Sequence, residues 1–204
     1  MNNNIVKTDK NYTYDILKND LQFLNYEYSL FKINSIGKST LNKDMIYIKL
    51  GEGNRKLFIN ASHHANEWMT SLITMMFIEK YLYLYKNKKN YKGRNIEELW
   101  NRTSIYIVPM VNPDGVGLCL KDKKVLTNDL YKNIWEKYIN NLEDWKANIR
   151  GVDLNLNYPA GWEQAVKNKA KKGIISPGSR DYPGPNAISE METKNIINFT
   201  NIFN

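Results

Sequence analysis

Residues 57–68 read Leu-Phe-Ile-Asn-Ala-Ser-His-His-Ala-Asn-Glu-Trp and join two predicted elements of different kinds. The apolar run at residues 57–59 is typical of a strand buried on both faces. Residues 67–85 predict a long helix that is apolar, and therefore buried, almost all round. The end of a strand followed by the start of a helix is where open α/β sheets bind ligands. His64 and Glu67 stand at this junction three residues apart, so their side chains can converge on one metal ion such as zinc.

The His-x-x-Glu spacing also has a second interpretation. A surface histidine can lie beside a glutamate that is stabilised by the dipole at a helix N-terminus. His63 is the only other histidine in the chain and has no carboxylate three residues later. If a metal ion binds at this junction, His64 is therefore the better candidate ligand.

The rest of the chain alternates strands with helices, which indicates an α/β layered domain. We expect strands at residues 29–36, 45–50, 56–61 and 104–110, and helices at residues 13–26, 129–138 and from Ser189 to the end. Thr13 is a candidate N-cap for the first helix, and Ser189 with Glu192 has the pattern of a capping box before the last. The Asn-Pro-Asp-Gly sequence at residues 112–115 predicts a turn, and the lysine-rich residues 86–94 predict a solvated loop.

Composition limits the possible classes of protein. The 204 residues are 42% hydrophobic and 25% charged, as in a globular domain, and one cysteine excludes a disulfide framework. The net charge of +8 permits attraction to nucleic acid, but the lysines are dispersed and no binding motif is present. The polar start and the shortness of the longest apolar stretch, residues 68–78, predict neither a signal peptide nor a membrane span. We expect no nucleic-acid or membrane partner.

A third motif occupies residues 145–159, Trp-Lys-Ala-Asn-Ile-Arg-Gly-Val-Asp-Leu-Asn-Leu-Asn-Tyr-Pro. Two cationic side chains, Lys146 and Arg150, precede an alternation of apolar residues with Asp153, Asn155 and Asn157. If this segment is extended, Asn155 and Asn157 point the same way. An edge strand followed by a loop is the simpler interpretation.

Together and in this order, the three motifs resemble the zinc carboxypeptidase family, from about residue 36 to the C-terminus. The resemblance implies a three-layer α/β/α sandwich with a mixed, twisted sheet, formed by one domain over residues 1–204. It implies that His64 and Glu67 are zinc ligands and that Asp153 holds the imidazole of His64. Lys146 falls near the family's arginine that stabilises the oxyanion, and Arg150 is a nearby substitute.

The resemblance also implies a substrate site. Asn155 matches the asparagine that holds the substrate carboxylate, and Asn66 is a further candidate for substrate binding. Leu156 stands where the family usually has an arginine that clamps a C-terminal carboxylate, and leucine cannot form that ion pair. Residues 151–163 are more similar to bacterial γ-D-glutamyl-L-diamino acid endopeptidases, which cut the stem peptide of peptidoglycan. We therefore expect a peptide or peptidoglycan fragment as substrate, and leave the oligomeric state open. With such a substrate and no predicted signal peptide, we expect a location in the cytoplasm or a spore compartment.

The family's third zinc ligand is a histidine on a strand after the helix that begins near Ser189, and its general-base glutamate comes later still. No histidine follows His64 in this chain. A catalytic zinc needs three protein ligands and a water, so we expect the domain to be incomplete at the C-terminus. We expect the chain alone to show little or no catalysis. The alternative is a degenerate, non-catalytic domain that binds peptides or cell-wall fragments.

Overall fold

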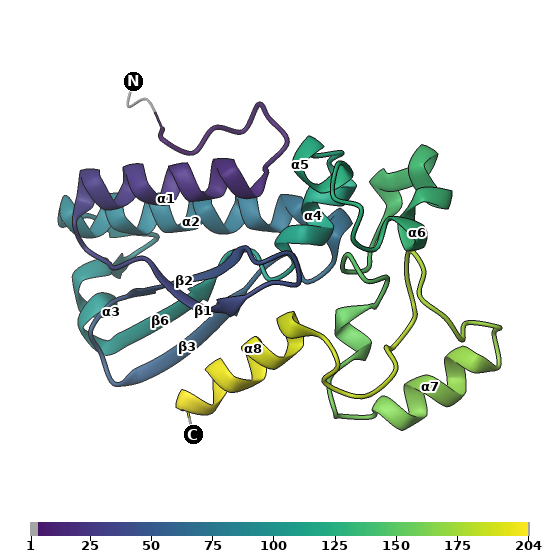
Figure 1. Cartoon of the computed structure of the whole chain (residues 1–204). Coiled ribbons are helices and arrows are strands. Elements are labelled where there is room, and N and C mark those ends of the chain that lie inside the picture. Colours follow the sequence, from purple (N-terminus) through teal and green to yellow (C-terminus); the bar gives the residue numbers. More distant parts are fainter. Residues whose placement is uncertain (1–3, 204) are drawn as a thin grey trace.

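A computed structural model describes residues 4–203, which form a four-stranded mixed sheet with the order β1-β2-β6-β3 (Figure 1). Its strands are β1 (Asn34–Lys38), β2 (Asp44–Leu50), β3 (Arg55–Asn60) and β6 (Thr103–Val108). β2 runs antiparallel to both β1 and β6, whereas β3 runs parallel to β6. β3 is therefore one edge of the sheet and β1 is the other.

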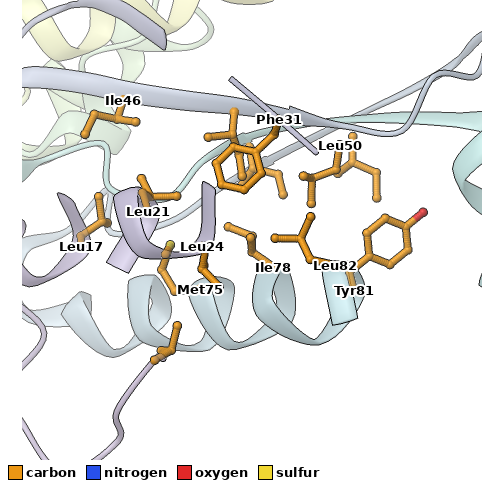
Figure 2. Close-up of a cluster of buried hydrophobic side chains, with 14 of the residues drawn as sticks. Leu17, Leu21, Leu24, Phe31, Ile46, Leu50, Met75, Ile78, Tyr81 and Leu82 are labelled. Carbon is orange, nitrogen blue, oxygen red and sulfur yellow. The ribbon is translucent and has the colours of Figure 1, made fainter. Parts of the chain in front are cut away.

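Helices cover both faces of this sheet. Figure 1 shows α1 (Tyr14–Tyr28) and α2 (Trp68–Lys86) on one face and α8 (Met191–Thr200) on the other. Side chains of α1 and α2 meet those of β2 in the main core (Figure 2), including Leu21, Leu24, Ile46, Leu50, Met75, Ile78 and Leu82. The predicted α/β class, with helices on both sides of a mixed sheet, is confirmed.

Shorter elements complete the chain. The helices are α3 (Ile96–Arg102), α4 (Pro113–Cys119), α5 (Lys123–Leu126), α6 (Lys132–Trp135) and α7 (Trp162–Ala170). The 3-10 helices are η1 (Ala65–Glu67), η2 (Glu136–Asp144), η3 (Leu154–Leu156) and η4 (Asn201–Phe203), and β4 (Asn90–Tyr91) pairs with β5 (Arg94–Asn95). None of the helices formed by residues 4–203 has both the length and the apolar character needed to cross a bilayer.

Several boundaries follow the sequence closely. Thr13 caps α1 as predicted, since its Oγ1 accepts a hydrogen bond from the N–H of Ile16 at 3.3 Å. β2 and β6 lie where their apolar patterns place them. The strand expected at residues 29–36 starts later, at Asn34, because Ser29 adopts a left-handed conformation that ends α1. The loop expected at residues 86–94 contains the small hairpin of β4 and β5.

Two predictions about local structure at helix starts are wrong. Residues 112–115 do not form a free turn, because Asn112 caps α4 by accepting the N–H of Gly115 at 3.0 Å and Pro113 is the first helical residue. The capping box before α8 does not form. Glu192 instead accepts hydrogen bonds from the N–H and hydroxyl of Thr40, each at 3.0 Å, and Ser189 bonds Glu190.

The burial predicted around residues 57–85 is also only partly correct. β3 is an edge strand, and the Leu57 side chain is 47% exposed. α2 leaves Ile73 59% and Phe77 38% exposed on one side. An apolar sequence shows that a segment can be buried, but a neighbour on each side is needed to bury it.

Candidate functional site

The carboxyl end of β3 leads directly into the candidate site. The N–H of Ala61 still bonds the carbonyl of Val108 at 3.0 Å, and Ser62 then turns the chain with a φ of 49°. The N–H of Ser62 donates to Thr70 Oγ1 at 2.9 Å, which fixes the turn to the first turn of α2. This geometry places His64 immediately before η1, with Glu67 at the start of α2.

His64 and Glu67 converge as their spacing predicts. Nδ1 of His64 lies 2.9 Å from Oε1 of Glu67. The His64 side chain is 15% exposed and that of Glu67 is 50% exposed, so the point where they meet is open to solvent on one side. The pair is therefore accessible to an ion or a substrate.

Asp153 lies behind the imidazole. Its Oδ1 is 3.3 Å from Nε2 of His64, although neither atom has a well-aligned hydrogen bond, and its Oδ2 binds Lys146 Nζ at 2.7 Å. Burial alone would raise the pKa of Asp153, but contact with His64 and Lys146 outweighs it and lowers the pKa to about 2. Asp153 is therefore ionised and raises the pKa of His64 in return.

The donor atoms fit a metal ion such as zinc. With its proton on Nε2, facing Asp153, the His64 ring presents an unprotonated Nδ1 to Glu67. Nδ1 of His64 and Oε1 of Glu67 would then be two hydrogen-bond acceptors 2.9 Å apart. Such a pair is stable only when a proton or a metal cation lies between the two atoms. Within residues 4–203, no group of three histidine, cysteine, aspartate or glutamate side chains is arranged to hold a metal. His64 and Glu67 are therefore a candidate pair of ligands and not a complete metal site within these residues.

The other predicted site residues lie at different distances from His64 and Glu67. Lys146 contacts the site through the bond of its Nζ to Asp153, and its carbonyl accepts a hydrogen bond from the N–H of Ala65 at 3.0 Å. Arg150 instead lies 3.8 Å from Glu190, with its guanidinium over the ring of Tyr131. Asn66 is in η1, and its Oδ1 is buried without a hydrogen-bond partner in the described chain.

Asn155 is exposed in η3, shortly after Asp153, whereas Asn157 is buried. The Asn157 amide donates to the carbonyl of Pro183 at 2.9 Å and holds the loop in place. The two asparagines therefore do not point the same way, because the segment forms a 3-10 turn and not a strand. Asn155 alone is available for a ligand.

A buried polar network near Asp153 was not predicted from the sequence. The side chain of Asn148 donates to Glu190 at 2.7 Å and Glu192 at 3.2 Å, and accepts the N–H groups of Arg150 and Val152. This network fixes the loop that carries Asp153 against the start of α8. Asn148 lies within the motif at residues 145–159, but nothing in the pattern indicated that it would contact two glutamates.

His63 also has a role that the sequence did not indicate. Its Nε2 lies 2.7 Å from the Tyr158 hydroxyl, and Asn112 donates to its carbonyl at 3.2 Å. Burial, assisted by the charge of His64, lowers the pKa of His63 to about 4, so the ring is neutral near pH 7. His63 thus joins the end of β3 to the loop after η3 and is not directed at Glu67.

Comparisons with known proteins identify relatives of this chain. The chain is 36% identical over 199 residues to γ-D-glutamyl-L-diamino acid endopeptidase 1 of Lysinibacillus sphaericus, a match that covers 96% of this chain and 49% of that protein. It is 27% identical over 169 residues to mast cell carboxypeptidase A of Rattus norvegicus, covering 80% of this chain and 35% of the relative. The chain spans about half the length of the curated relatives it matches, or less.

Solved structures show the same fold. Bovine thrombin-activatable fibrinolysis inhibitor superposes with a TM-score of 0.67 at 19% identity, over 95% of this chain and 57% of that one. The sequence profile of the zinc carboxypeptidase family matches residues 17–203. This chain therefore belongs to the zinc carboxypeptidase family of metallopeptidases.

Proposed function

We propose that this chain carries part of the metal and substrate site of a zinc-dependent peptidase. One observation supports this most strongly: Nδ1 of His64 and Oε1 of Glu67 are 2.9 Å apart, with the ionised Asp153 on the far side of the ring. Both side chains are good zinc ligands, and a carboxylate behind a ligating histidine fixes its tautomer and raises its basicity.

Zinc bound there would polarise the scissile carbonyl and lower the pKa of a water molecule. The residues of this chain would then do three things. Asp153 keeps the proton of His64 on Nε2. Lys146 keeps Asp153 ionised. Its positive charge would also stabilise the oxygen of the scissile carbonyl, which becomes negative when water attacks. Asn155 and Asn66 orient the substrate. The third zinc ligand and the general base are proposed to come from residues outside these 204.

For the substrate, we propose the γ-D-glutamyl–diamino acid bond of a peptidoglycan stem peptide. Leu156 supports this proposal, because it stands where the family usually has an arginine that binds the C-terminal carboxylate of a substrate, and leucine cannot form that ion pair. The 36% identity to the Lysinibacillus sphaericus endopeptidase supports it further. Ordinary carboxypeptidase action would require that missing arginine.

The test uses a chimera in which this chain replaces the aligned region of the Lysinibacillus sphaericus relative, fused to all of the remaining sequence of that protein. With zinc, the fused protein should cleave L-Ala-γ-D-Glu-diaminopimelate and lose that activity on His64→Ala substitution. No cleavage by the folded, zinc-loaded fusion would reject the proposal. It would favour the alternative of a non-catalytic peptide-binding domain, which the two-ligand donor set also permits.

A further inference from the structure

We propose that Thr40 is a positioning residue of the candidate metal site, and that it acts on Asp153 through two buried side chains. Thr40 lies in the turn between β1 and β2 (residues 39–43), and the buried side chains are those of Glu192 and Asn148. The inference rests on the proposed function, in which Asp153 holds the imidazole of a zinc ligand. It goes further by giving a role to a turn that the proposed function leaves out.

Glu192 joins this turn to the loop that carries Asp153. It lies in the first turn of α8 and is fully buried. Its Oε1 accepts the N–H and the hydroxyl of Thr40, each at 3.0 Å, and its Oε2 accepts the side-chain amide of Asn148 at 3.2 Å. Burial raises the pKa of Glu192, with a smaller contribution from the charge of Asp114, and the hydrogen bonds oppose that rise. A buried carboxylate depends on its donors, so Glu192 holds Thr40 and Asn148 in fixed positions relative to each other.

The turn is fixed by further contacts, so it can serve as an anchor. The N–H of Leu41 donates to Oδ2 of the buried Asp114 at 2.7 Å. Nζ of Lys43 donates to the carbonyl of Pro113 at 3.1 Å. Two bonds to α4 therefore hold the turn, while Thr40 presents two donors to α8.

Asn148 transmits the constraint to Asp153. Its Oδ1 accepts the N–H groups of Arg150 at 3.1 Å and Val152 at 3.0 Å, and its own N–H donates to the Val152 carbonyl at 2.9 Å. Because the amide oxygen is bound to these two donors, the amide nitrogen must face the carboxylates. A displaced Glu192 would therefore disturb the turn that ends at Val152, and the next residue is Asp153.

A second contact links the same region to His64. The side chain of Asn112 donates to the carbonyl of Ala147, the residue before Asn148, at 3.2 Å. It also donates at 3.2 Å to the carbonyl of His63, the residue before His64. The segments before Asn148 and His64 are therefore held together, and a shift of Asn148 would alter both sides of the contact between the imidazole and the carboxylate behind it.

Glu190 defines the competing explanation. It accepts the Asn148 amide at 2.7 Å and the Ser189 hydroxyl at 2.7 Å. If Glu190 is sufficient to hold Asn148, the loss of a donor from Thr40 will leave the Asp153 loop unchanged. The proposal requires that the bond to Glu192 is also needed.

Thr40→Val tests the coupling without altering any residue of the metal site. Valine has the shape of threonine but lacks the hydroxyl that donates to Glu192. In the metal-free chain, we expect amide hydrogen exchange at Arg150 and Val152 to become about tenfold faster, because their acceptor Asn148 is held less firmly. Zinc affinity, measured by competition with a chromophoric chelator, should fall by about three- to tenfold.

Glu192→Gln is the second variant and should have the larger effect on both measurements. Its amide has one oxygen and one nitrogen, so it places a donor against the donors of either Thr40 or Asn148. Tyr12→Phe is the matched control, because it also removes a hydroxyl, one that donates to Asp20 at 2.6 Å in the main core. We expect it to lower thermal stability but to leave both the exchange at Val152 and the zinc affinity unchanged.

Thermal melts confirm that each variant is folded at the temperature of the measurements. Exchange at Arg150 and Val152 that is unchanged in Thr40→Val and Glu192→Gln would overturn the inference, as would equal acceleration by Tyr12→Phe. Faster exchange with unaltered zinc affinity would also overturn it, because the turn would then stabilise the loop without positioning the site. Failure of the wild-type chain to bind zinc would instead overturn the proposed function, which the metal-free exchange rates do not test.

Discussion

Nε2 of His64 lies 3.3 Å from Oδ1 of the buried Asp153, while Nδ1 of the same ring faces Glu67. A ring held between two carboxylates has one nitrogen for the proton and one for a metal ion. Under the proposed function, Asp153 would keep the proton on Nε2, and the half-exposed Glu67 would share a cation with Nδ1.

Replacing Asp153 by asparagine tests that contribution. Asp153→Asn keeps the size of the side chain but removes the charge behind His64, so zinc affinity should fall by about 10–100-fold. Zinc competition with a chromophoric chelator measures this. Asp181→Asn, which changes a carboxylate that binds Lys169 at 2.7 Å, is the control and should bind zinc as the wild type does. Equal affinity of the two variants would exclude a role for Asp153.

Lys146 should matter for stability as well as for the site. Lys146→Met leaves the fully buried Asp153 without its 2.7 Å partner, and we expect a loss of about 2 kcal/mol in the free energy of unfolding. Lys169→Met breaks a pair of the same length whose Asp181 side chain is 30% exposed, and should cost less than about 1 kcal/mol. Urea denaturation compares the two. A smaller loss for Lys146→Met than for Lys169→Met would show that Asp153 does not depend on the lysine.

The hydrogen bonds of Asn148 predict a larger loss of stability on substitution than those of Lys146. Asn148→Ala removes the amide that donates to Glu190 and Glu192 and accepts two backbone N–H groups. Because the Asn148 amide, both glutamates and Val152 are buried, we expect a loss of about 3 kcal/mol in unfolding free energy. Asn168→Ala, at an exposed asparagine bonded to Gln164, should change it by less than about 0.5 kcal/mol. Near-equal losses of unfolding free energy for Asn148→Ala and Asn168→Ala would mean that Glu190 and Glu192 form other hydrogen bonds when the Asn148 amide is absent.

The single cysteine gives a pH-dependent prediction. Burial, and then the nearby charges of Glu143 and Asp144, raise the pKa of the Cys119 thiol to about 11. At pH 8 the thiolate fraction should therefore be about 100-fold below that of an ordinary cysteine, and alkylation by iodoacetamide correspondingly slow.

The rate should rise with pH until the thiol ionises, and unfolding in urea should remove the protection. The same pKa shift makes the folded state lose stability as the pH rises through about 9 to 11, because the unfolded chain loses the proton first. Cys119→Ala should lack this part of the alkaline destabilisation. Rapid alkylation of the folded chain at pH 8 would show that the Cys119 thiol is not buried with a raised pKa.

The sequence predicted elements well where one local pattern decides the outcome. β2 alternates, β6 is an apolar run, and Thr13 is a strong cap, so each lies close to its predicted position. Asn112 shows the limit of local patterns, since the same Asn-Pro pair suits both a turn and the start of α4. The resemblance to a family supplied the link between Asp153 and His64, which are too far apart in the chain for any periodicity to connect.

Long-range polar contacts could not be predicted. Glutamate is rarely buried, so no sequence pattern placed Glu190 and Glu192 against Asn148. Nor did any pattern indicate that Glu192 would bind Thr40 instead of capping α8. Burial on both faces of β3 was expected from its composition alone. Whether an apolar strand has a second neighbour depends on the rest of the sheet, which composition does not show.

The most direct test of the metal site uses the fact that the chain has two histidines. A nitrogen-15 NMR spectrum of the imidazole rings, recorded with and without one equivalent of zinc, resolves both nitrogens of each ring. We expect zinc to shift Nδ1 of His64, with Nε2 still protonated towards Asp153 and both nitrogens of His63 unchanged. Zinc shifts at His63, or at Nε2 of His64 in place of Nδ1, would contradict the assignment of His64 and Glu67 as metal ligands.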